Sequence, residues 1–272
     1  MPICTKTPLT SEKFNAAIDE LLAAKPFIYH EVFGTSRRGA PLRALVIGSG
    51  ERSILINASH HANEWLTTLV LTRFIEKNAD FIPENITLHC IPLVNPDGVD
   101  MVNDQRRPYP PCWKANACGV DLNSNYPAGW ELARARKFAL GYTRAGARDF
   151  VGESPLCEPE SCAMAAYTAF NDIDITLSLH TQGEEIYWRY MDYNPIGAKE
   201  LATRLGAVSG YECVDVPDES SHAGYRDWFI AEFNRVGLTI ECGFGENPLP
   251  IEQFEDMYGK VERILWECFR AC

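Results

Sequence analysis

Short apolar runs that alternate with helix-like segments constrain the fold of this chain more than any other feature. The runs cover residues 53–57, 86–94, 174–179 and 238–241, and they are rich in Ile, Leu and Val. Apolar residues spaced as on one face of a helix precede, separate or follow these runs. Strands that alternate with helices predict an α/β fold, in which a mixed or mainly parallel sheet carries helices on both faces.

Local signals predict where two of the helices begin. Apolar positions within 14–22 indicate a helix for which Thr10 or Ser11 can serve as the N-cap. Residues 158–170 indicate another helix, and Cys157 is expected at its N-cap position. A thiol is a poorer cap than a hydroxyl, so we expect this helix start to be weakly capped.

The middle of the chain is predicted to be less regular. The sequence Asn95-Pro-Asp-Gly is typical of a turn and is expected to close the strand over 86–94. Residues 99–151 follow, rich in Pro, Arg, Trp and Gly and without a clear period. Irregular stretches of this length are uncommon in compact domains unless they build a site. A helix over 254–269 is expected to close the chain.

Length and charge exclude several classes of protein. The 272 residues can bury a sizeable core, and we expect one domain over 1–272 without a pro-domain or wall-binding domain. A net charge of −12 disfavours nucleic acid and anionic membranes as partners. No apolar run approaches the ~18 residues that span a bilayer. The first ten residues lack the features of a secretory signal, so the expected location is cytoplasmic. The sequence does not indicate the oligomeric state.

The ten cysteines contain no Cys-x-x-Cys pair, so they do not predict a tetrathiolate zinc module. Several lie within apolar runs, as Cys90 does, and the expectation is free thiols in a reducing compartment. Cys112 and Cys118 form the first pair to consider for a bridge.

Three chemically active residues fall at the ends of predicted strands. His61 follows the run 53–57, His180 follows 174–179, and Glu241 ends 238–241. Ligands of such sheets bind beyond the carboxyl ends of the strands. With Glu64, the two histidines would supply two imidazoles and one carboxylate to zinc, leaving a fourth position for water. Such a His-x-x-Glu pair is by itself a weak signal.

Glu241 is the candidate base for hydrolysis by metal-activated water. It stands beside the glycine-rich bend Cys242-Gly-Phe-Gly, and it could accept a proton from water and pass it to a leaving amine. The alternative is an ordinary glutamate in a salt bridge at the end of a strand. The adjacent His60 is expected to be structural, because the spacing to Glu64 favours His61 as the ligand.

Six ordered blocks of sequence resemble the zinc carboxypeptidases of the M14 type, from about residue 34 to the end of the chain. Within that group the chain looks most like bacterial γ-D-glutamyl-L-diamino acid peptidases, which cut the stem peptide of peptidoglycan. The resemblance implies a three-layer α/β/α fold with about eight strands. The blocks are residues 59–65 (SHHANEW), 95–98 (NPDG), 119–126 (GVDLNSNY), 154–160 (SPLCEPE), 178–180 (SLH) and 239–241 (TIE).

The same resemblance implies roles for individual residues. His61, Glu64 and His180 would bind one zinc ion, and Glu241 would act as general base and acid. Asp121 would orient His61 from behind; the alternative is a turn aspartate. Lys114 falls where the family usually has an arginine that stabilises the oxyanion, unless it is only a solvated loop lysine.

One departure from the family pattern and one alignment concern the substrate. Carboxypeptidases of this family have Asn-Arg where this chain has Asn123-Ser124. The missing guanidinium removes a clamp for a C-terminal carboxylate, so a strict carboxypeptidase is not expected. Arg226 aligns with the floor of the specificity pocket, and we hypothesise that it pairs with a carboxylate of the leaving half, such as that of diaminopimelate. The alternative is a surface arginine.

These observations predict a zinc metallopeptidase that hydrolyses the bond between γ-D-glutamate and diaminopimelate or lysine in peptidoglycan-derived peptides. The alternatives are a metallocarboxypeptidase on ordinary peptides, or a deacylase of N-acyl amino acids on the same scaffold. A zinc-containing peptide-binding module is the alternative outside enzymes. The presence of Glu241 argues against it, because a module without turnover has no need of a base.

Overall fold

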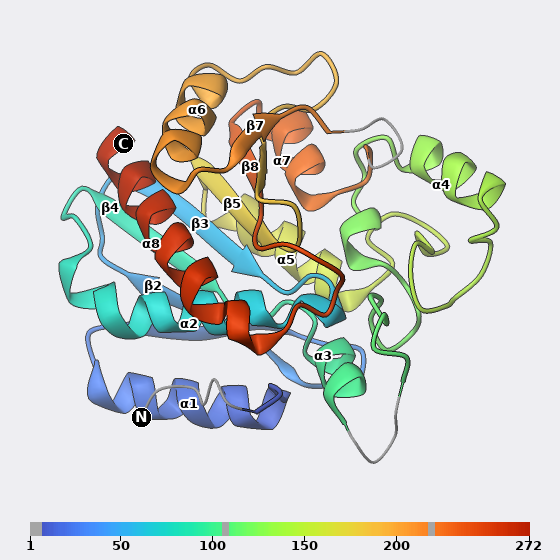
Figure 1. The fold of residues 1–272 in the computed structure, drawn as a ribbon, viewed down its shortest axis with the longest axis horizontal. Coiled ribbons are helices and arrows are strands. Elements are labelled where there is room, and N and C mark those ends of the chain that lie inside the picture. Colours follow the sequence, from blue (N-terminus) through green and yellow to red (C-terminus); the bar gives the residue numbers. More distant parts are fainter. Residues whose placement is uncertain (1–6, 105–108, 217–220) are drawn as a thin grey trace.

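The computed structural model describes residues 7–104, 109–216 and 221–272 and contains one eight-stranded sheet (Figure 1). The strand order is β1-β2-β4-β3-β5-β8-β6-β7. The strands are β1 (Tyr29–Thr35), β2 (Pro41–Ile47), β3 (Arg52–Ala58), β4 (Ile86–Ile91), β5 (Ile175–His180), β6 (Glu185–Tyr187), β7 (Glu212–Val214) and β8 (Val236–Glu241).

The centre of the sheet is parallel and its flanks are mixed. Strands β4, β3, β5 and β8 run parallel to one another, whereas β1 and β2 on one side and β6 on the other pair antiparallel to their inner neighbours. The predicted α/β fold with a mixed, mainly parallel sheet of about eight strands is therefore confirmed. Because the four central strands are parallel, their carboxyl ends meet at one edge of the sheet.

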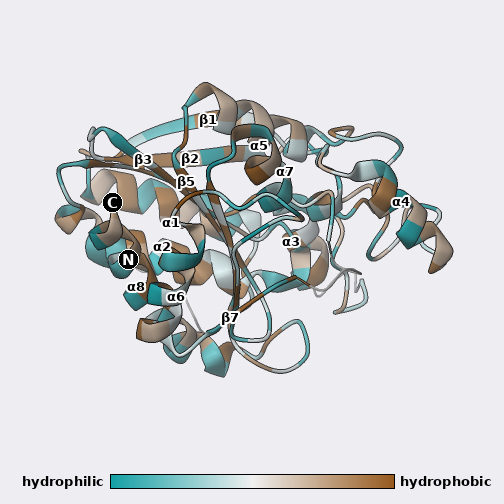
Figure 2. Ribbon diagram, turned by 90° about the horizontal axis from the view of Figure 1, so that it is seen from above, coloured by the Kyte–Doolittle hydropathy of each residue, from teal (hydrophilic) through white to brown (hydrophobic). Residues whose placement is uncertain are grey.

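Helices cover both faces of the sheet, which makes the molecule three-layered (Figure 1). Along β3, Ile54 and Ile56 belong to one apolar cluster and Leu55 to another, since successive side chains of a strand point to opposite faces. The central strands are accordingly hydrophobic (Figure 2). The first cluster includes residues of α1 (Ser11–Ala24), α2 (Leu66–Asn78), α6 (Ala198–Ser209) and α8 (Phe254–Ala271), and the second of α5 (Pro159–Phe170) and α7 (Tyr225–Phe233).

The N-cap of α1 is the residue that the sequence predicts, whereas the N-cap of α5 is not. Thr10 is the N-cap of α1, and its side chain accepts a hydrogen bond from the amide of Lys13. The expected cap of α5 was wrong by one residue. Glu158 occupies the N-cap position, because Pro159 is pre-organised for the first turn of the helix and sets the boundary there.

The middle of the chain is more helical than predicted. The segment Asn95–Gly98 is not a turn but the start of α3 (Pro96–Asn103), with Asn95 accepting a hydrogen bond from the amide of Gly98. Asparagine followed by proline caps a helix as readily as it starts a turn, so the local signal is ambiguous. The stretch 99–151 also contains α4 (Trp130–Ala139), which the sequence analysis missed.

Nine cysteines lie within the described residues, and all are free thiols, including Cys112 and Cys118, the candidate pair for a bridge. Cys4 lies outside the described residues, as do the first six residues of the segment inspected for a secretory signal. Across the part of the chain that the structure describes, no helix combines the length and the apolar character that crossing a bilayer requires.

Candidate active site

Three buried side chains converge at the carboxyl edge of the central strands. Nδ1 of His61 lies 2.8 Å from Oε1 of Glu64, and Nδ1 of His180 lies 2.8 Å from Oε2 of the same carboxylate. The two Nδ1 atoms are 3.2 Å apart. His61 follows β3, Glu64 ends the short helix η1 (Ala62–Glu64), and His180 ends β5. Neighbouring parallel strands therefore bring together residues that are more than a hundred positions apart.

The donor set fits a zinc ion. The ligand atoms of His61, Glu64 and His180 all lie within 4.8 Å of one another, which allows one ion to contact all three. Two imidazole nitrogens and one carboxylate are the donors of many catalytic zinc sites. Burial opposes ionisation of Glu64, yet His61 and His180 more than offset this and lower its pKa. The carboxylate is thus held in the form that binds a metal.

Behind His61 stands a buried carboxylate with a cation beside it. Oδ1 of Asp121 is 3.2 Å from Nε2 of His61, so the carboxylate holds the ring with Nδ1 turned towards Glu64. Its other oxygen is 3.3 Å from Nζ of Lys114. Burial raises the pKa of Asp121, but Lys114 and His61 outweigh it and hold that pKa well below its usual range. Asp121 therefore contacts both side chains instead of serving only a turn.

Lys114 lies close to the triad and remains an ammonium. Burial lowers its pKa, but the carboxylates of Asp121 and Asp149 more than compensate and raise it. Its side chain is 22% exposed, and it lines the cavity in front of the triad. Lys114 is thus neither a freely solvated loop residue nor a neutral amine.

Glu241 ends β8 directly beside the end of β5, where it is paired in register with His180. Burial, together with the Glu64 carboxylate, raises the pKa of Glu241 to about 8. The chain turns sharply after it at Gly243, which has a φ of +70°. This left-handed conformation favours glycine, and a Cβ there would also lie 2.7 Å from the side chain of Leu249 and 2.8 Å from that of Gln253. No described cation lies within ion-pairing distance of the Glu241 carboxylate, so the strand-end salt bridge is not formed.

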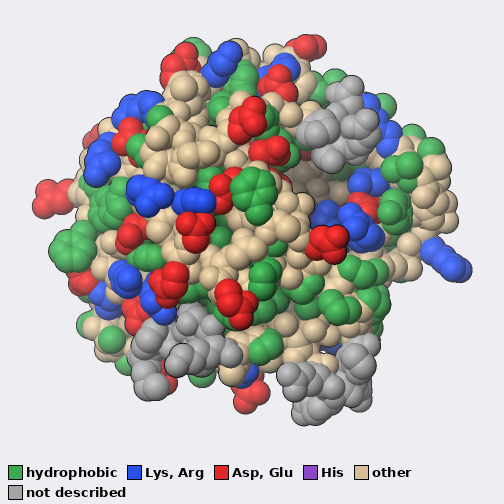
Figure 3. Space-filling view, viewed as in Figure 1, with side chains coloured by type: hydrophobic (Ala, Val, Ile, Leu, Met, Phe, Trp, Pro, Cys, Tyr) green, Lys and Arg blue, Asp and Glu red, His purple; other side chains and the backbone are tan. Residues whose placement is uncertain are grey.

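A cavity of about 640 Å³ opens in front of these groups. Figure 3 shows a hollow on the right of the molecule with Lys and Arg side chains gathered beside it. Most of the predicted site residues line this cavity, whereas Asp121 and His180 lie behind its wall. The predicted residues in the lining are His61, Glu64, Lys114, Asn123, Ser124, Arg226 and Glu241.

Asn123 and Ser124 lie where the sequence comparison expected contact with the substrate. Both line the cavity, and Oδ1 of Asn123 accepts a hydrogen bond of 2.9 Å from the amide of Tyr225 at the start of α7. Nδ2 of Asn123 lies 3.5 Å from Nε2 of His180. Asn123 thus ties the helix that carries Arg226 to a residue of the triad.

Arg226 is buried and not a surface arginine. Its guanidinium forms an ion pair with Asp227 and lies 5.8 Å from the centre of the Tyr187 ring. Because the positive charge already has an internal partner, Arg226 is a fixed donor in the cavity wall rather than an uncompensated charge. His60 is also structural, as expected, since its Nε2 lies 3.0 Å from the hydroxyl of Tyr126.

Sequence reasoning missed one side of the cavity. Lys137, Arg148 and Asp149 line it, and they come from the end of α4 and from the loop that precedes α5. The only available signal was the abundance of arginine in the segment 99–151, which carries no spacing pattern.

Comparison with known proteins agrees with this geometry. A family model described as zinc carboxypeptidase, Peptidase_M14, matches residues 14–259. The chain belongs to the zinc carboxypeptidase family. It is 38% identical over 282 residues to the uncharacterized protein YqgT of Bacillus subtilis, covering 92% of this chain and 74% of that protein. It is 36% identical over 275 residues to gamma-D-glutamyl-L-diamino acid endopeptidase 1 of Lysinibacillus sphaericus, covering 89% of this chain and 67% of that protein.

Solved structures of this family share the fold. The bovine thrombin-activatable fibrinolysis inhibitor, in complex with a tick carboxypeptidase inhibitor, superposes with a TM-score of 0.83 over 98% of both chains at 18% identity. The chain is therefore a zinc metallopeptidase by family, and the His61, Glu64 and His180 cluster is the arrangement that fits its zinc ion.

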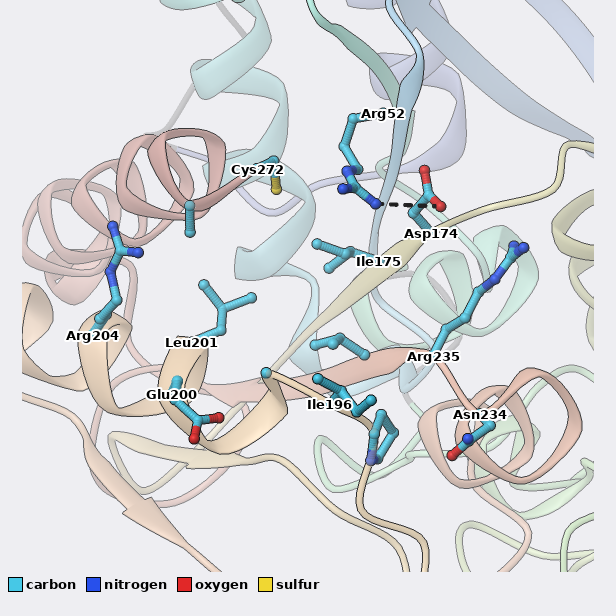
Figure 4. Close-up of a pocket in the computed structure, with 14 residues that line it drawn as sticks. Arg52, Asp174, Ile175, Ile196, Glu200, Leu201, Arg204, Asn234, Arg235 and Cys272 are labelled. Atoms are coloured by element: carbon cyan, nitrogen blue, oxygen red, sulfur yellow. Dashed lines mark ion pairs between the residues drawn. The ribbon is translucent and has the colours of Figure 1, made fainter.

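A second cavity, of about 450 Å³, lies at the opposite ends of the same strands (Figure 4). Arg52 of β3, Ile175 of β5 and Val236 of β8 line it, and these are the amino ends of the parallel strands. Arg52 lies 3.6 Å from Asp174, and the cavity contains none of the triad. This member of the zinc carboxypeptidase family thus keeps its candidate catalytic groups at the carboxyl edge, where sheets of this kind bind ligands.

Proposed function

We propose that this protein hydrolyses the bond between γ-D-glutamate and a diamino acid in peptides derived from peptidoglycan. The observation that carries the proposal is the 36% identity, over 89% of the chain, to an endopeptidase named for that bond. The cavity lining supports it. Ser124 stands where a carboxypeptidase of this family would have the arginine that grips a C-terminal carboxylate, and a serine offers no such fork.

We propose hydrolysis by metal-activated water, for which His61, Glu64 and His180 would hold the zinc ion. When bound, zinc supplies Lewis-acid polarisation of the scissile carbonyl and activation of the attacking water. Glu241 accepts the proton that the attacking water loses and delivers it to the amine of the diamino acid as the amide bond breaks.

Other side chains prepare the site for that proton transfer. Lys114 presents a positive charge to the oxygen of the scissile carbonyl, where negative charge develops as water adds. Asp121 keeps Nδ1 of His61 turned to the triad by holding Nε2, 3.2 Å away. Arg226, on the same side of the cavity as Glu241, would donate to a carboxylate of the diamino acid.

Two substrates test the proposal. Purified, zinc-loaded protein is incubated with L-Ala-γ-D-Glu-meso-diaminopimelate and, separately, with a peptide that ends in an ordinary α-linked residue, and products are identified by mass spectrometry. We expect free diaminopimelate and L-Ala-D-Glu from the first peptide and no cleavage of the second. Release of the C-terminal residue from the second peptide alone would identify a general carboxypeptidase instead.

A variant of Glu241 shows whether the measured activity comes from this protein or from a contaminating peptidase. Glu241→Gln preserves the shape of the side chain but removes the base, so we expect kcat/KM to fall by about 10²- to 10⁴-fold, the range of general acid–base catalysis. Zinc content, measured by elemental analysis, should remain that of the wild type. Full activity of this variant would rule out Glu241 as the proton carrier.

A further inference from the structure

Three cations, Lys114, Lys137 and Arg148, line one wall of the active-site cavity, and two buried carboxylates, Asp149 in the wall and Asp121 behind it, are paired with them. Nζ of Lys137 lies 2.5 Å from one oxygen of Asp149, and Nε of Arg148 lies 2.6 Å from the other. Lys114 is paired with Asp121 at 3.3 Å. Three positive charges thus face two negative ones, which leaves one positive charge in excess on this wall.

The excess charge is most accessible at Arg148. Its side chain is 53% exposed, whereas those of Lys114 and Lys137 are 22% and 18% exposed. The Arg148 guanidinium donates a hydrogen bond through Nε to Asp149. Its two terminal nitrogens donate no hydrogen bond to any of the described residues. Asp149 is buried, and its carboxylate holds the Nε side of the Arg148 guanidinium. The two terminal N–H groups are therefore held ready to donate to a ligand.

The backbone fixes this wall relative to the triad. The amides of Lys114 and Ala115 both donate to the carbonyl of Ala147, at 2.7 and 3.0 Å, which ties the loop of Arg148 to that of Lys114. The amide of Asp121 donates to the carbonyl of Phe150 at 2.8 Å. Arg148 lies between these two anchors, so its position depends on the same contacts that place Lys114 and Asp121.

The wall lies on the side of the acyl half of the substrate. Glu241 must reach the leaving amine, so the leaving half extends towards the β8 and β6 side, where Thr239 and Tyr187 line the cavity with Arg226. Lys114 is linked through Asp121 to His61, which follows β3, and Arg148 is tied to Lys114 through the carbonyl of Ala147; β3 and β8 lie on opposite sides of β5. The half of the substrate that carries the scissile carbonyl therefore runs along Lys114 and past Arg148.

We propose that Arg148, oriented by Asp149, binds the free α-carboxylate of the γ-linked glutamyl residue. The proposal rests on the proposed function. In a γ-linked glutamyl residue the chain continues through the side-chain carbonyl, which leaves a charged carboxylate on the α-carbon. In an ordinary α-linked peptide the α-carboxyl is itself the scissile carbonyl, so no free carboxylate remains on the α-carbon. A guanidinium with two free terminal NH2 groups recognises a carboxylate in bidentate fashion, so Arg148 favours γ-linked glutamyl residues whose α-carboxylate is free.

A matched pair of substrates tests this selection. L-Ala-γ-D-Glu-meso-diaminopimelate and L-Ala-γ-D-isoglutaminyl-meso-diaminopimelate differ only in that the second has a carboxamide in place of the α-carboxylate. We expect the wild-type protein to favour the carboxylate by about 10- to 100-fold in kcat/KM, the range for hydrogen bonds to charged groups. In Arg148→Ala the carboxylate substrate should lose this advantage, while kcat/KM for the amide stays near its wild-type value.

Two further variants show whether the preference for the carboxylate substrate depends on Arg148 specifically. Arg144→Ala removes an exposed arginine of the same loop that does not line the cavity, and its preference should equal that of the wild type. Arg148→Lys keeps the charge but loses the fork, so an intermediate preference is expected. Equal kcat/KM of the wild type for both substrates, or an equal loss for both in Arg148→Ala, would overturn the proposal. Cleavage of neither substrate by the wild type would instead overturn the proposed function.

Discussion

A buried histidine far from the cavity should make the stability of this protein depend on pH. His89 lies on β4, is 5% exposed, and its Nδ1 is 2.7 Å from the hydroxyl of Tyr167 on α5. Burial lowers the pKa of His89 from 6.5 to about 4. The unfolded chain therefore binds the proton more readily than the folded protein between these two values. The free energy of unfolding is therefore undiminished above about pH 6.5 and falls as the pH drops towards 4.

The magnitude follows from the two pKa values. A tenfold change in proton affinity corresponds to 1.36 kcal/mol, so the difference between 6.5 and about 4 is worth about 3 kcal/mol in total. Between pH 7 and pH 5, this histidine should account for a loss of about 2 kcal/mol in the free energy of unfolding. That loss is a large fraction of the ~5–15 kcal/mol that stabilises typical domains.

Comparison with His89→Asn isolates this contribution from other titrating groups. The asparagine Oδ1 can accept the hydrogen bond from Tyr167, but the side chain does not titrate. Urea unfolding of both proteins, followed by tryptophan fluorescence at equal zinc content, gives the free energy of unfolding at pH 7, 6 and 5. We expect the wild type to lose about 2 kcal/mol more than the variant. A constant difference between the two proteins over this range would show that His89 is not the source.

Two other variants test the site. Asp121→Asn should weaken zinc binding by about 10- to 100-fold, measured by competition with a chromophoric chelator, because the amide no longer holds Nε2 of His61 as a carboxylate does. Unchanged affinity would mean that Asp121 does not orient the ligand. Arg226→Lys keeps a cation beside Asp227 but loses the planar fork, so kcat/KM for the diaminopimelate peptide should fall by about tenfold. Wild-type kinetics would exclude Arg226 from the leaving-group pocket.

The ligand triad was predictable because its residues follow recognisable strands. Apolar runs ahead of His61 and His180 mark β3 and β5, and parallel neighbours must end at the same edge. Glu241 could be added by the same reasoning. The order of the strands along the chain and the chemistry of the residues after them indicated the site, and the resemblance to the M14 family implied the role of each residue.

Other features could not be predicted because their local signals are ambiguous or absent. Asparagine followed by proline and glycine fits both a turn and a helix start, and contacts formed elsewhere decide in favour of α3. The sequence placed Arg226 at the floor of the specificity pocket, but it did not show that Asp227 pairs with the Arg226 guanidinium. The irregular segment 99–151 was expected to build a site, and the family resemblance pointed to Lys114, Asn123 and Ser124. No spacing pattern revealed that Lys137, Arg148 and Asp149 would also reach the cavity.

By itself, the sequence determined the class of fold, the candidate donors of a zinc site and the candidate base, because strand patterns and strand ends are local properties of the chain. Only the tertiary structure decided which cations share the cavity and which are already neutralised. Lys114 and Arg148 meet through backbone contacts between irregular loops, such as those to Ala147, and Lys137 of α4 joins them through its ion pair with Asp149. Such contacts have no periodicity, so the charge that a substrate meets on that wall emerges only when the chain is folded.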